Sequence, residues 1–516
     1  MPFGLTAFLT AFVASVITAP LMARFARCVG LLDQPDDRRK LHDRPIPLTG
    51  GPTILISAFV AVTITLWLNP ELLKPTVNDA KFLASLLVSG GLIVAIGVID
   101  DRYGLRGRQK LAGQIVAALI MLPSGIIVSK VSAFGFTMSF GDLAPIMTLL
   151  WLVGATNALN LIDGVDGLAS TTGIVLSLSI AAVLYIFGGR PDGLLISLVL
   201  AGALFGFLIF NFPPARMFLG DSGSMLIGLV LGAVAMKCSI KQYAAVALIL
   251  PTAIWAIPLF DVAMAIVRRN LTGRSIYETD RGHLHHCLQR NGVGGARLLG
   301  VTAGLCAITG MGAVVASYTG RESIACVGVA MSLSMLVLTR SFGHTEMSLL
   351  TNRLRRLTGS MLQRSVPDKA VLHDEEVRLH GDHNWQQLWE TLTEFAERFE
   401  MDTVELIVNL PLIGEEYHGS WKRKTATETH EKWKSEIPLI VHDMRVGHLR
   451  VAGAVGDGSI CKWMSDLIGG LEAFESELVS LIQELRREKL GVTSTPTPSV
   501  AESPSTLSDS QKFALQ

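Results

Sequence analysis

The first 340 residues alternate between long apolar stretches and short polar segments. A helix needs about 20 mostly apolar residues to cross about 30 Å of hydrocarbon, and eleven stretches of this sequence approach that length. They lie near residues 3–26, 50–69, 81–99, 111–129, 144–160, 171–187, 193–210, 223–237, 243–267, 297–317 and 322–339. The pattern predicts an all-α polytopic membrane domain, residues 1–340, with about eleven transmembrane helices.

Two places in this pattern are less regular than the rest, and the first stretch has to be distinguished from a signal peptide. Pro123 and Gly125 interrupt the fourth stretch, and residues 130–143 resemble neither a clear loop nor a clear span. The first stretch lacks the basic start of a secretory signal, because its first cation is Arg24, at its far end. We therefore expect the first stretch to be a membrane span and not a cleaved signal peptide.

The positions of Lys and Arg between the apolar stretches predict an orientation. Loops after odd-numbered stretches contain 17 Lys and Arg residues, and loops after even-numbered stretches contain 7. Because cations stay on the cytoplasmic side, the odd-numbered loops and the C-terminal region should be cytoplasmic. The prediction is a multi-pass protein of the inner (plasma) membrane with its N-terminus outside.

Residue 340 also divides the chain by charge. The whole sequence has 44 basic and 44 acidic residues, but residues 1–340 contain 25 basic and 17 acidic ones, so the remainder is acidic. This balance excludes a uniformly basic nucleic-acid-binding protein. The six cysteines show no paired spacing, which argues against a disulfide framework or a cysteine-based zinc site.

The region after residue 340 has the pattern of a soluble domain with flanking segments. The pattern of residues 341–371 predicts an amphipathic linker, either a helix on the surface of the inner leaflet or a plain linker helix. Residues 372–490 predict an α+β domain, with a helix near 385–400, apolar runs at 404–410 and 447–455, and a long amphipathic helix near 461–489. Residues 491–516, rich in Ser, Thr and Pro, predict a disordered tail.

The polar residues that could carry chemistry gather beside four of the apolar stretches. They are Asp100 and Asp101; Asn157, Asn160, Asp163 and Asp166; Asp221; and His283, His285 and His286. Taken singly, each group could be a solvated helix end, a turn or a solvated loop. All of them, however, fall on the predicted cytoplasmic side, where ionisable groups at a bilayer boundary are costly unless paired or functional.

These residue types indicate phosphate chemistry. Carboxylate and amide oxygens suit Mg²⁺, with Mn²⁺ as a possible substitute, and Mg²⁺ completes its shell with waters and substrate phosphate oxygens. Lys40, Lys110, Arg281 and the histidines could balance the remaining phosphate charge. The inventory favours a membrane enzyme that transfers a phosphoryl-linked group to a lipid.

Six motifs in order resemble one known family. They are DDRRKLHDRPIPLTGG (36–51), IDD (99–101), NALNLIDGVDGL (157–168), FLGDSGS (218–224), PLFD (258–261) and DRGHLHH (280–286). Together they resemble the polyprenyl-phosphate N-acetylhexosamine-1-phosphate transferases of glycosyltransferase family 4, which include WecA-type and TagO-type enzymes, with MraY as a cousin. The resemblance covers roughly residues 1–340.

The resemblance implies that the chain transfers a sugar 1-phosphate from UDP-GlcNAc, or a close relative, to polyprenyl (undecaprenyl) phosphate in cell-envelope polysaccharide synthesis, releasing UMP. It implies that Asn160 and Asp221 are Mg²⁺ ligands, and that Asp100 and Asp101 lie at the reacting phosphates, one of them as a base or orienting group. Lys40 and Lys110 would bind phosphate, and Asp163 and Asp166, in the same motif as Asn157, would lie at the nucleotide-sugar site. The diphosphate or sugar would be contacted by His283, His285 and His286.

Several alternatives stay open at this point. A phospho-MurNAc-pentapeptide transferase would typically have three adjacent histidines, whereas this chain has HLHH. A lipid or sugar transporter would usually place its polar site near the midplane, and a prenyl-chain enzyme would need a further acid soon after Asp101. Asp261 could be a structural carboxylate or part of the site's edge. The acidic domain could regulate the enzyme, bind a downstream glycosyltransferase or mediate a homodimer.

Overall fold

The computed structural model describes most of the first two thirds of the chain and parts of the rest. The described residues are 2–34, 45–73, 76, 79–134, 136–187, 191–239, 249–271, 282–339, 341–343, 373–380, 385–398, 401–410, 415–423, 432–441, 444–454, 474 and 478–485. The chain divides into two compact units, Met1–Thr358 and Gly359–Gln516, and each is treated by itself below.

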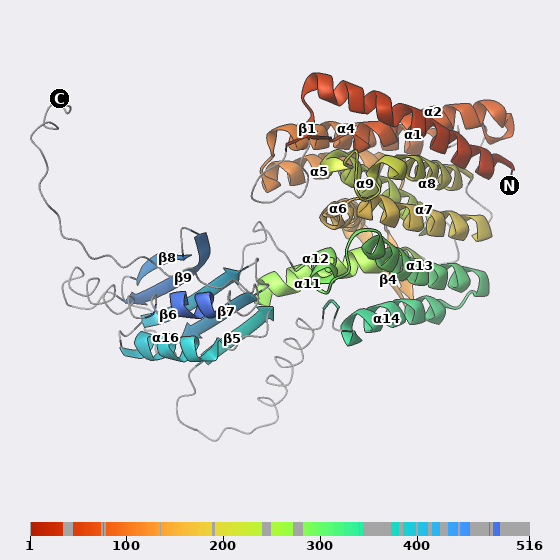
Figure 1. The fold of residues 1–516 in the computed structure, drawn as a ribbon. Helices are drawn as coiled ribbons and strands as arrows, with labels where there is room; N and C mark the ends of the chain where they lie inside the picture. The colour runs from red at the N-terminus through yellow and green to blue at the C-terminus, as the bar shows by residue number, and fades with distance from the viewer. Residues whose placement is uncertain are drawn as a thin grey trace, which may run out of the picture. The chain divides into compact units, whose positions relative to one another are not determined.

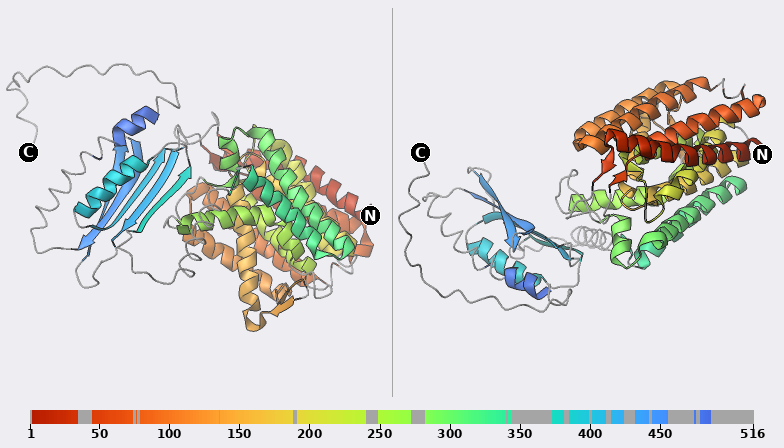
Figure 2. Two further views of the ribbon diagram at one scale, coloured as in Figure 1. Left: turned by 90° about the horizontal axis from the view of Figure 1, so that it is seen from below. Right: turned by 45° about the horizontal axis from the view of Figure 1, so that its top comes forward.

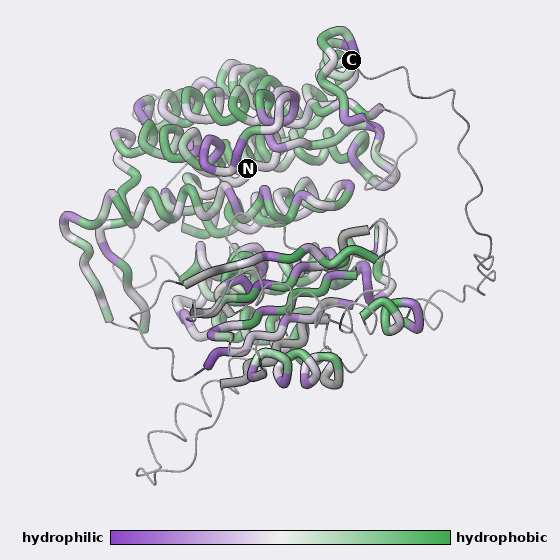
Figure 3. Tube along the Cα trace, turned by 90° about the vertical axis from the view of Figure 1, so that its left-hand side faces the viewer, coloured by the Kyte–Doolittle hydropathy of each residue, from purple (hydrophilic) through white to green (hydrophobic). Residues whose placement is uncertain are grey.

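The first unit is helical. Its helices are α1 (Pro2–Val29), α2 (Gly50–Leu68), α4 (Ala80–Tyr103), α5 (Gly107–Met121), α6 (Ala144–Ile162), α7 (Leu168–Phe187), α8 (Pro191–Asn211), α9 (Gly220–Ser239), α10 (Ile249–Ile254), α11 (Ala256–Leu271), α12 (Leu284–Arg290), α13 (Gly295–Thr319) and α14 (Glu322–Leu338). Helices α1, α2, α7 and α8 lie alongside one another (Figure 1). Hydrophobic residues run along most of the helix lengths (Figure 3).

Seven of the described helical segments are long and apolar enough to cross a membrane. They are Phe3–Val29, Gly50–Leu68, Ala80–Tyr103, Gly141–Ile162, Leu168–Phe187, Pro191–Asn211 and Gly295–Thr319. The chain is therefore a multi-pass helical membrane protein. Helix α5 has 15 residues and α14 has 17, and the stretch predicted at 243–267 divides at Trp255 into α10 and α11. The predicted number of eleven spans is thus not established by these helices.

The irregular part of the sequence between α5 and α6 forms a β-hairpin. After α5, Leu122–Ser124 makes a short 3-10 helix that contains Pro123, and Gly125 has a positive φ of 83°. Strands β3 (Lys130–Ala133) and β4 (Phe136–Ser139) then pair antiparallel, and the short 3-10 helix Gly141–Leu143 leads into α6. The 130–143 segment is therefore a hairpin between two helices.

Close helix packing brings α2 and α4 against the start of α9. An added Cβ at Gly51 would lie 2.6 Å from the Ser222 carbonyl carbon, and one at Gly97 would lie 2.2 Å from the Ser222 Cα. Only glycine allows backbones to approach this closely. These contacts fix the end of α4, which bears Asp100 and Asp101, beside the first turn of α9, which bears Asp221.

A short two-stranded element ties the chain after α1 to the same place. Strands β1 (Leu32–Asp33) and β2 (Ile46–Pro47) pair antiparallel. The N–H of Phe218 donates to the carbonyl of Pro47 at 2.9 Å, and Thr49 donates to the carbonyl of Phe218 at 3.3 Å. The residues before α2 and those before α9 therefore lie together. Pro70–Leu72 forms a further 3-10 helix at the other end of α2.

The second unit contains a five-stranded antiparallel sheet in the order β5-β7-β6-β9-β8. The strands are β5 (His373–His380), β6 (Met401–Leu410), β7 (Glu415–Lys422), β8 (Lys432–Val441) and β9 (Met444–Ala454). Helix α16 (Gln386–Arg398) and helical residues 478–485 lie on one face of the sheet (Figure 2). A small α+β fold thus occupies the acidic part of the chain, as the sequence predicts.

The core of this second unit lies between the sheet and its helices. Trp385, Trp389 and Trp421 are buried there, together with Leu478 and Ile482 of the last helical segment. The predicted linker at 341–371 lies outside the described residues except for 341–343, and the predicted tail at 491–516 lies wholly outside them.

Candidate active site

Asp221 is the point at which side chains from three helices meet. Lys110 Nζ on α5 donates to Asp221 Oδ2 at 2.6 Å, and Asn160 Nδ2 on α6 donates to Asp221 Oδ1 at 2.6 Å. Asn160 also donates to the hydroxyl of Ser224 at 3.0 Å. The Asp221 carboxylate therefore accepts hydrogen bonds from both an ammonium group and an amide. Lys110 and Asn160, which precede Asp221 by 111 and 61 positions in the sequence, lie next to it in the fold.

The two adjacent carboxylates Asp100 and Asp101 make different contacts. Asp100 Oδ2 lies 3.1 Å from Lys110 Nζ, and Asp100 Oδ1 accepts the N–H of Leu105 at 2.6 Å. Asp101 instead accepts the N–H groups of Asp221 at 2.8 Å and Ser222 at 3.3 Å. The first N–H groups of a helix lack partners within the helix and carry positive charge, so Asp101 caps α9 from another helix and orients Asp221.

Asp101 and Asp221 also line a polar cavity of ≈ 370 Å³. Besides these two, its wall consists of Asp33, Leu48, Asp163, Gly164, Val165, Asp166, Asn211, Phe218, Leu219 and Gly220. Asp166 Oδ2 accepts the N–H of Ala215 at 2.9 Å, which ties the loop after α6 to the segment before α9. The cavity is therefore bordered by several carboxylates from separate segments.

The charge around this cavity favours a bound cation. Burial raises the pKa of the Asp163 carboxyl well above its usual range, and the negative charges of Asp221 and Asp101 raise it further. Lys110 opposes this shift. Neighbouring negative charges disfavour the ionised form of Asp163, so a cation bound among these carboxylates would relieve their repulsion and favour the ionised form.

The donor set fits Mg²⁺. Among the described residues, no group of three or more His, Cys, Asp or Glu side chains is arranged to hold a metal ion by itself. Mg²⁺ commonly takes one or two protein carboxylates and completes its shell with waters and substrate phosphates. Asp221 offers a carboxylate, and a half-turn of the Asn160 amide would offer its Oδ1. These two residues could hold the ion once a phosphate-bearing substrate is bound.

His285 joins the histidine motif to the cavity wall. An added Cβ at Gly164 would lie 2.2 Å from His285 Nε2, so only glycine at position 164 permits this contact. The ring stacks in parallel with His283 at 6.2 Å and contacts His286 at 4.2 Å, centroid to centroid. Burial, with a further contribution from His286, lowers the pKa of His285 to about 3. His285 is therefore neutral near pH 7.

His285 is also a buried polar group that has no hydrogen-bond partner among the described residues. Neither ring nitrogen is hydrogen-bonded within the described part of the chain, although the residue is only 3% exposed. Buried polar atoms are nearly always hydrogen-bonded in folded proteins. A neutral imidazole offers one donor and one acceptor, so a ligand with polar groups would satisfy this ring.

Asp261 proves to be a structural carboxylate that holds the histidine motif. It is fully buried on α11, accepts the N–H of Leu284 at 2.8 Å, and lies 3.1 Å from His283 Nδ1. Leu284 is the first residue of α12, whose N-cap is His283. Asp261 therefore satisfies the start of α12 and orients the first of the three histidines.

The remaining predicted residues differ in how the structure places them. Lys40 lies outside the described residues. The Asn157 amide pairs with Gln114, at 2.7 Å from Asn157 Nδ2 to Gln114 Oε1, and not with Asp221. Sequence reasoning did not single out Gln114, Ser224 or the cavity-lining Asp33. A signal for Gln114 exists, since it follows Lys110 by four residues and so lies on the same helix face.

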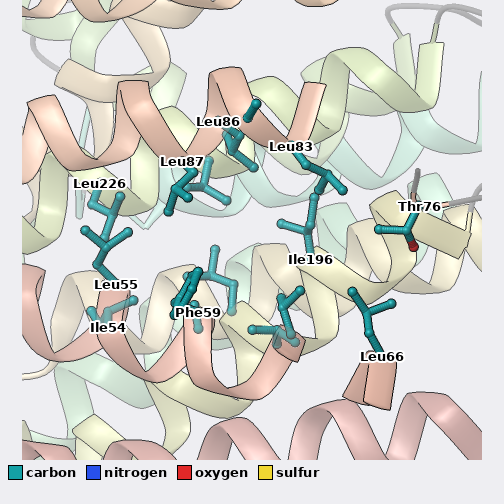
Figure 4. A pocket seen from close by; sticks show the side chains of 16 residues that line it. Ile54, Leu55, Phe59, Leu66, Thr76, Leu83, Leu86, Leu87, Ile196 and Leu226 are labelled. Carbon is teal, nitrogen blue, oxygen red and sulfur yellow. The ribbon is translucent and has the colours of Figure 1, made fainter. Parts of the chain in front are cut away.

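A second cavity, of ≈ 280 Å³, lies among α2, α4, α8 and α9 (Figure 4). Its wall is aliphatic except for Phe59 and Thr76, and it shares no residue with the polar cavity. Along α9, the tightly packed Ser222 lies between Asp221 and Leu226, the first α9 residue of the apolar wall. The described wall of the apolar cavity therefore offers no charged group for a phosphate.

Fold and site together define a multi-pass helical membrane protein with a carboxylate-lined cavity built from helix ends. The sequence profile described as glycosyl transferase family 4 matches residues 83–239, which include Asp100, Asp101, Lys110, Asn160 and Asp221. Three curated proteins match this chain over longer stretches, of 289 to 312 residues.

The chain is 33% identical over 289 residues to a probable undecaprenyl-phosphate N-acetylglucosaminyl 1-phosphate transferase of Bacillus subtilis, covering 56% of this chain and 77% of that protein. It is 38% identical over 312 residues to a decaprenyl-phosphate N-acetylglucosaminephosphotransferase of Mycolicibacterium smegmatis, covering 56% and 75%. A phospho-N-acetylmuramoyl-pentapeptide-transferase of Shouchella clausii is 32% identical over 298 residues, covering 53% and 86%. The chain belongs to this family of polyprenyl-phosphate sugar-1-phosphate transferases.

Replacing Gly220 by alanine should destabilise the site. Gly220 has a φ of +70°, and an added Cβ would lie 2.6 Å from Asp101 Oδ2. The left-handed conformation alone costs a non-glycine residue about 1–2 kcal/mol, and displacement of the cap on α9 adds to this. We expect Gly220→Ala to lower the unfolding temperature in detergent. Gly91→Ala, where an added Cβ meets nothing within 4 Å, is the control; equal unfolding temperatures for both variants would contradict the cap.

Removing the Asp261 carboxylate should loosen the histidine motif. Asp261→Ala leaves the Leu284 N–H and His283 without their acceptor, and loss of a helix cap costs about 1 kcal/mol. We expect faster amide hydrogen exchange across α12, measured by mass spectrometry, with a smaller effect for Asp261→Asn, which keeps an oxygen acceptor. Asp142→Ala, at an exposed position, is the control. Unchanged exchange in Asp261→Ala would refute the capping role.

Proposed function

We propose that the chain transfers N-acetylglucosamine 1-phosphate from UDP-GlcNAc to a polyprenyl phosphate, with release of UMP. The two relatives named for N-acetylglucosamine transfer support both the sugar and the lipid acceptor. The observation that carries the proposal is the convergence of Lys110 and Asn160 on Asp221 at the wall of a polar cavity. The volume of this cavity, ≈ 370 Å³, lies within the usual range for small-molecule sites, about 300–1,000 Å³.

The reaction exchanges one diphosphate bond for another. An oxygen of the lipid phosphate attacks the phosphorus that bears the sugar, and the bond from that phosphorus to the oxygen of UMP breaks. The products are a polyprenyl-diphosphate sugar and UMP. The lipid phosphate is largely ionised near neutral pH, since the second pKa of a phosphate monoester is about 6, so no proton has to be removed before the attack.

The barrier to this exchange is mainly electrostatic, because two anions must approach. Mg²⁺, when bound, would neutralise charge on the diphosphate and on the departing UMP. Lys110 supplies a fixed cation beside Asp221 and Asp100. Fixed charges aimed at developing negative charge are usually the largest contribution to such catalysis. Asp101 contributes by holding the first turn of α9, and thereby Asp221, in place.

The remaining residues shape the site for the nucleotide sugar. Asp163 and Asp166 border the cavity on the loop after α6. His285, neutral and without a hydrogen-bond partner among the residues that the structure describes, would offer hydrogen bonds to the sugar or diphosphate beside Gly164. Lys40 adds a further phosphate contact in this proposal, as the motif resemblance implies. The carboxylates, which repel free phosphate, require that the substrate arrive with a cation.

We further propose that the membrane unit has eleven spans, with its N-terminus outside and the site on the cytoplasmic face of the plasma membrane. Helices α5, α9 and α14, together with α10 and α11, would supply the spans beyond the seven described above. The excess of cations in the odd-numbered loops supports this orientation. The C-terminal α+β unit would then be cytoplasmic, where it could regulate transfer, mediate a dimer or bind a downstream glycosyltransferase.

A second candidate is the transfer of phospho-N-acetylmuramoyl-pentapeptide. The similarity to the Shouchella clausii protein favours it, because the match covers 86% of that protein. The HLHH motif favours N-acetylglucosamine instead, as the motif resemblance implies. An experiment decides between the two: purified protein is incubated with a panel of UDP-sugars and polyprenyl phosphate. The lipid product is then identified by its mass in mass spectrometry.

Asp221→Asn should nearly abolish transfer. The change removes the charge that Lys110 and the metal share, and the loss of one such electrostatic contact costs about 10²–10³ in kcat. The assay is UMP release from UDP-GlcNAc with polyprenyl phosphate, with and without Mg²⁺. Glu71→Gln, an exposed residue, is the matched charge-neutralising control. Unimpaired, Mg²⁺-independent turnover by Asp221→Asn would refute the site, and uptake of sugar without UMP release would indicate a transporter.

His285→Gln should lower activity without changing the pH profile. Because the pKa of His285 is lowered to about 3, the ring stays neutral at every pH above about 4. Glutamine keeps a neutral donor and acceptor, so we expect kcat/KM to fall about ten-fold through altered geometry. The profile from pH 6 to pH 9 should keep its shape. Disappearance of an acidic limb near pH 6.5 in the variant would show that His285 acts as a titrating base.

A further inference from the structure

A second layer of polar contacts, buried or half-buried, lies one helical turn from the residues that meet at Asp221. Gln114 follows Lys110 by four residues on α5, Asn157 precedes Asn160 by three on α6, and Met225 follows Asp221 by four on α9. Residues three or four apart lie on the same helix face. The three helices that supply the site therefore also supply this layer.

The contacts in this layer use every N–H of two side-chain amides. Asn157 Nδ2 donates to Gln114 Oε1 at 2.7 Å and to the carbonyl of Val153 at 2.8 Å. Gln114 Nε2 donates to Asn157 Oδ1 at 3.3 Å and to Met225 Sδ at 3.2 Å. Each amide carries two donors, and all four are engaged. Gln114 is only 2% exposed and Asn157 is half-buried, so the Gln114 side of the pair is shielded from water.

A fully paired network of this kind restricts the rotation and spacing of helices more than apolar packing does. Apolar contacts tolerate small rotations and shifts, whereas breaking a buried amide pair leaves polar groups unsatisfied at a cost of about 1–3 kcal/mol. A rotation of α5 or α6 would break the Gln114–Asn157 pair and would also move Lys110 or Asn160 away from Asp221. The two layers are therefore coupled through the helix backbones.

We propose that Gln114 is a positioning residue for the transfer reaction. Paired with Asn157 and in contact with Met225, it sets the rotation and spacing of α5 and α6 so that Lys110 and Asn160 reach Asp221 together. Asn157 is accordingly a positioning residue as well, and it acts through Gln114 and not on the substrate. This inference rests on the proposed function for its kinetic consequence, and on the helix geometry alone for its effect on metal binding.

An amide exchange tests the proposal. Gln114→Asn shortens the pair by one methylene, Asn157→Gln lengthens it by one, and the double variant restores the total length. We expect each single variant to raise the half-saturating Mg²⁺ concentration and lower kcat/KM about ten-fold, which corresponds to one lost buried hydrogen bond. The double variant should recover to within about three-fold of the natural protein, since a restored pair regains most of that energy.

A measurement without turnover separates positioning from catalysis. Mn²⁺ binding to the purified protein, followed by electron paramagnetic resonance with UDP-GlcNAc present and lipid phosphate omitted, should weaken in both single variants and recover in the double variant. Ser89→Ala is the matched control, because Ser89 Oγ donates to the Ala117 carbonyl at 2.6 Å and joins α4 to α5 away from the site. Its unfolding temperature should fall, but its Mn²⁺ affinity should not change.

The outcomes separate the two proposals. If the single variants lose stability as Ser89→Ala does, yet keep their Mn²⁺ affinity and Mg²⁺ dependence, Gln114 is merely structural and the inference is wrong. Failure of the double variant to recover would also overturn it. If the natural protein binds Mn²⁺ but releases no UMP in the presence of polyprenyl phosphate, the proposed function fails, while the Mn²⁺ affinities of the variants still decide the positioning role.

Discussion

The arrangement of the membrane unit depends on holding one carboxylate, Asp221, at the first turn of α9. A carboxylate near a helix N-terminus is stabilised by the unpaired N–H groups, but here Asp101 of α4 accepts those N–H groups instead. Asp221 is thereby free to face Lys110 and Asn160. The glycine contacts with Ser222 make this possible, because any larger residue at position 51 or 97 would separate the helices.

This constraint explains why polar groups can gather at the ends of apolar helices. Each charge at the boundary of a membrane is costly unless it is paired, and the site pairs its charges across α4, α5, α6 and α9. The same pairing leaves an excess of carboxylates beside the cavity, since neither Asp163 nor Asp166 is ion-paired with a lysine among the described residues. A substrate that brings a divalent cation with its phosphates complements that excess.

Much of the helical unit and of the site follows from the sequence because both depend on local patterns. Apolar stretches of span length predicted the helices, and the motifs around Asp101, Asn160 and Asp221 placed the residues that converge. The break at Trp255 and the hairpin at 130–143 could not be predicted, since they depend on packing between distant helices. The cap on α9 could not be predicted from the sequence either, because its donor and acceptor lie 120 residues apart.

The histidine motif shows how a sequence motif can mix two kinds of residue. His283 and His285 are separated by one residue, yet Asp261 holds His283 while His285 keeps both ring nitrogens without partners in the described structure. The first position fixes the start of α12, and the third presents a neutral imidazole to the loop at Gly164. A single motif thus joins a residue that anchors the start of α12 to a buried imidazole that contacts Gly164, and the two are only two positions apart. The Gln114–Asn157 pair follows the same principle on α5 and α6, where Asn157 in a functional motif serves the geometry of its neighbour Asn160.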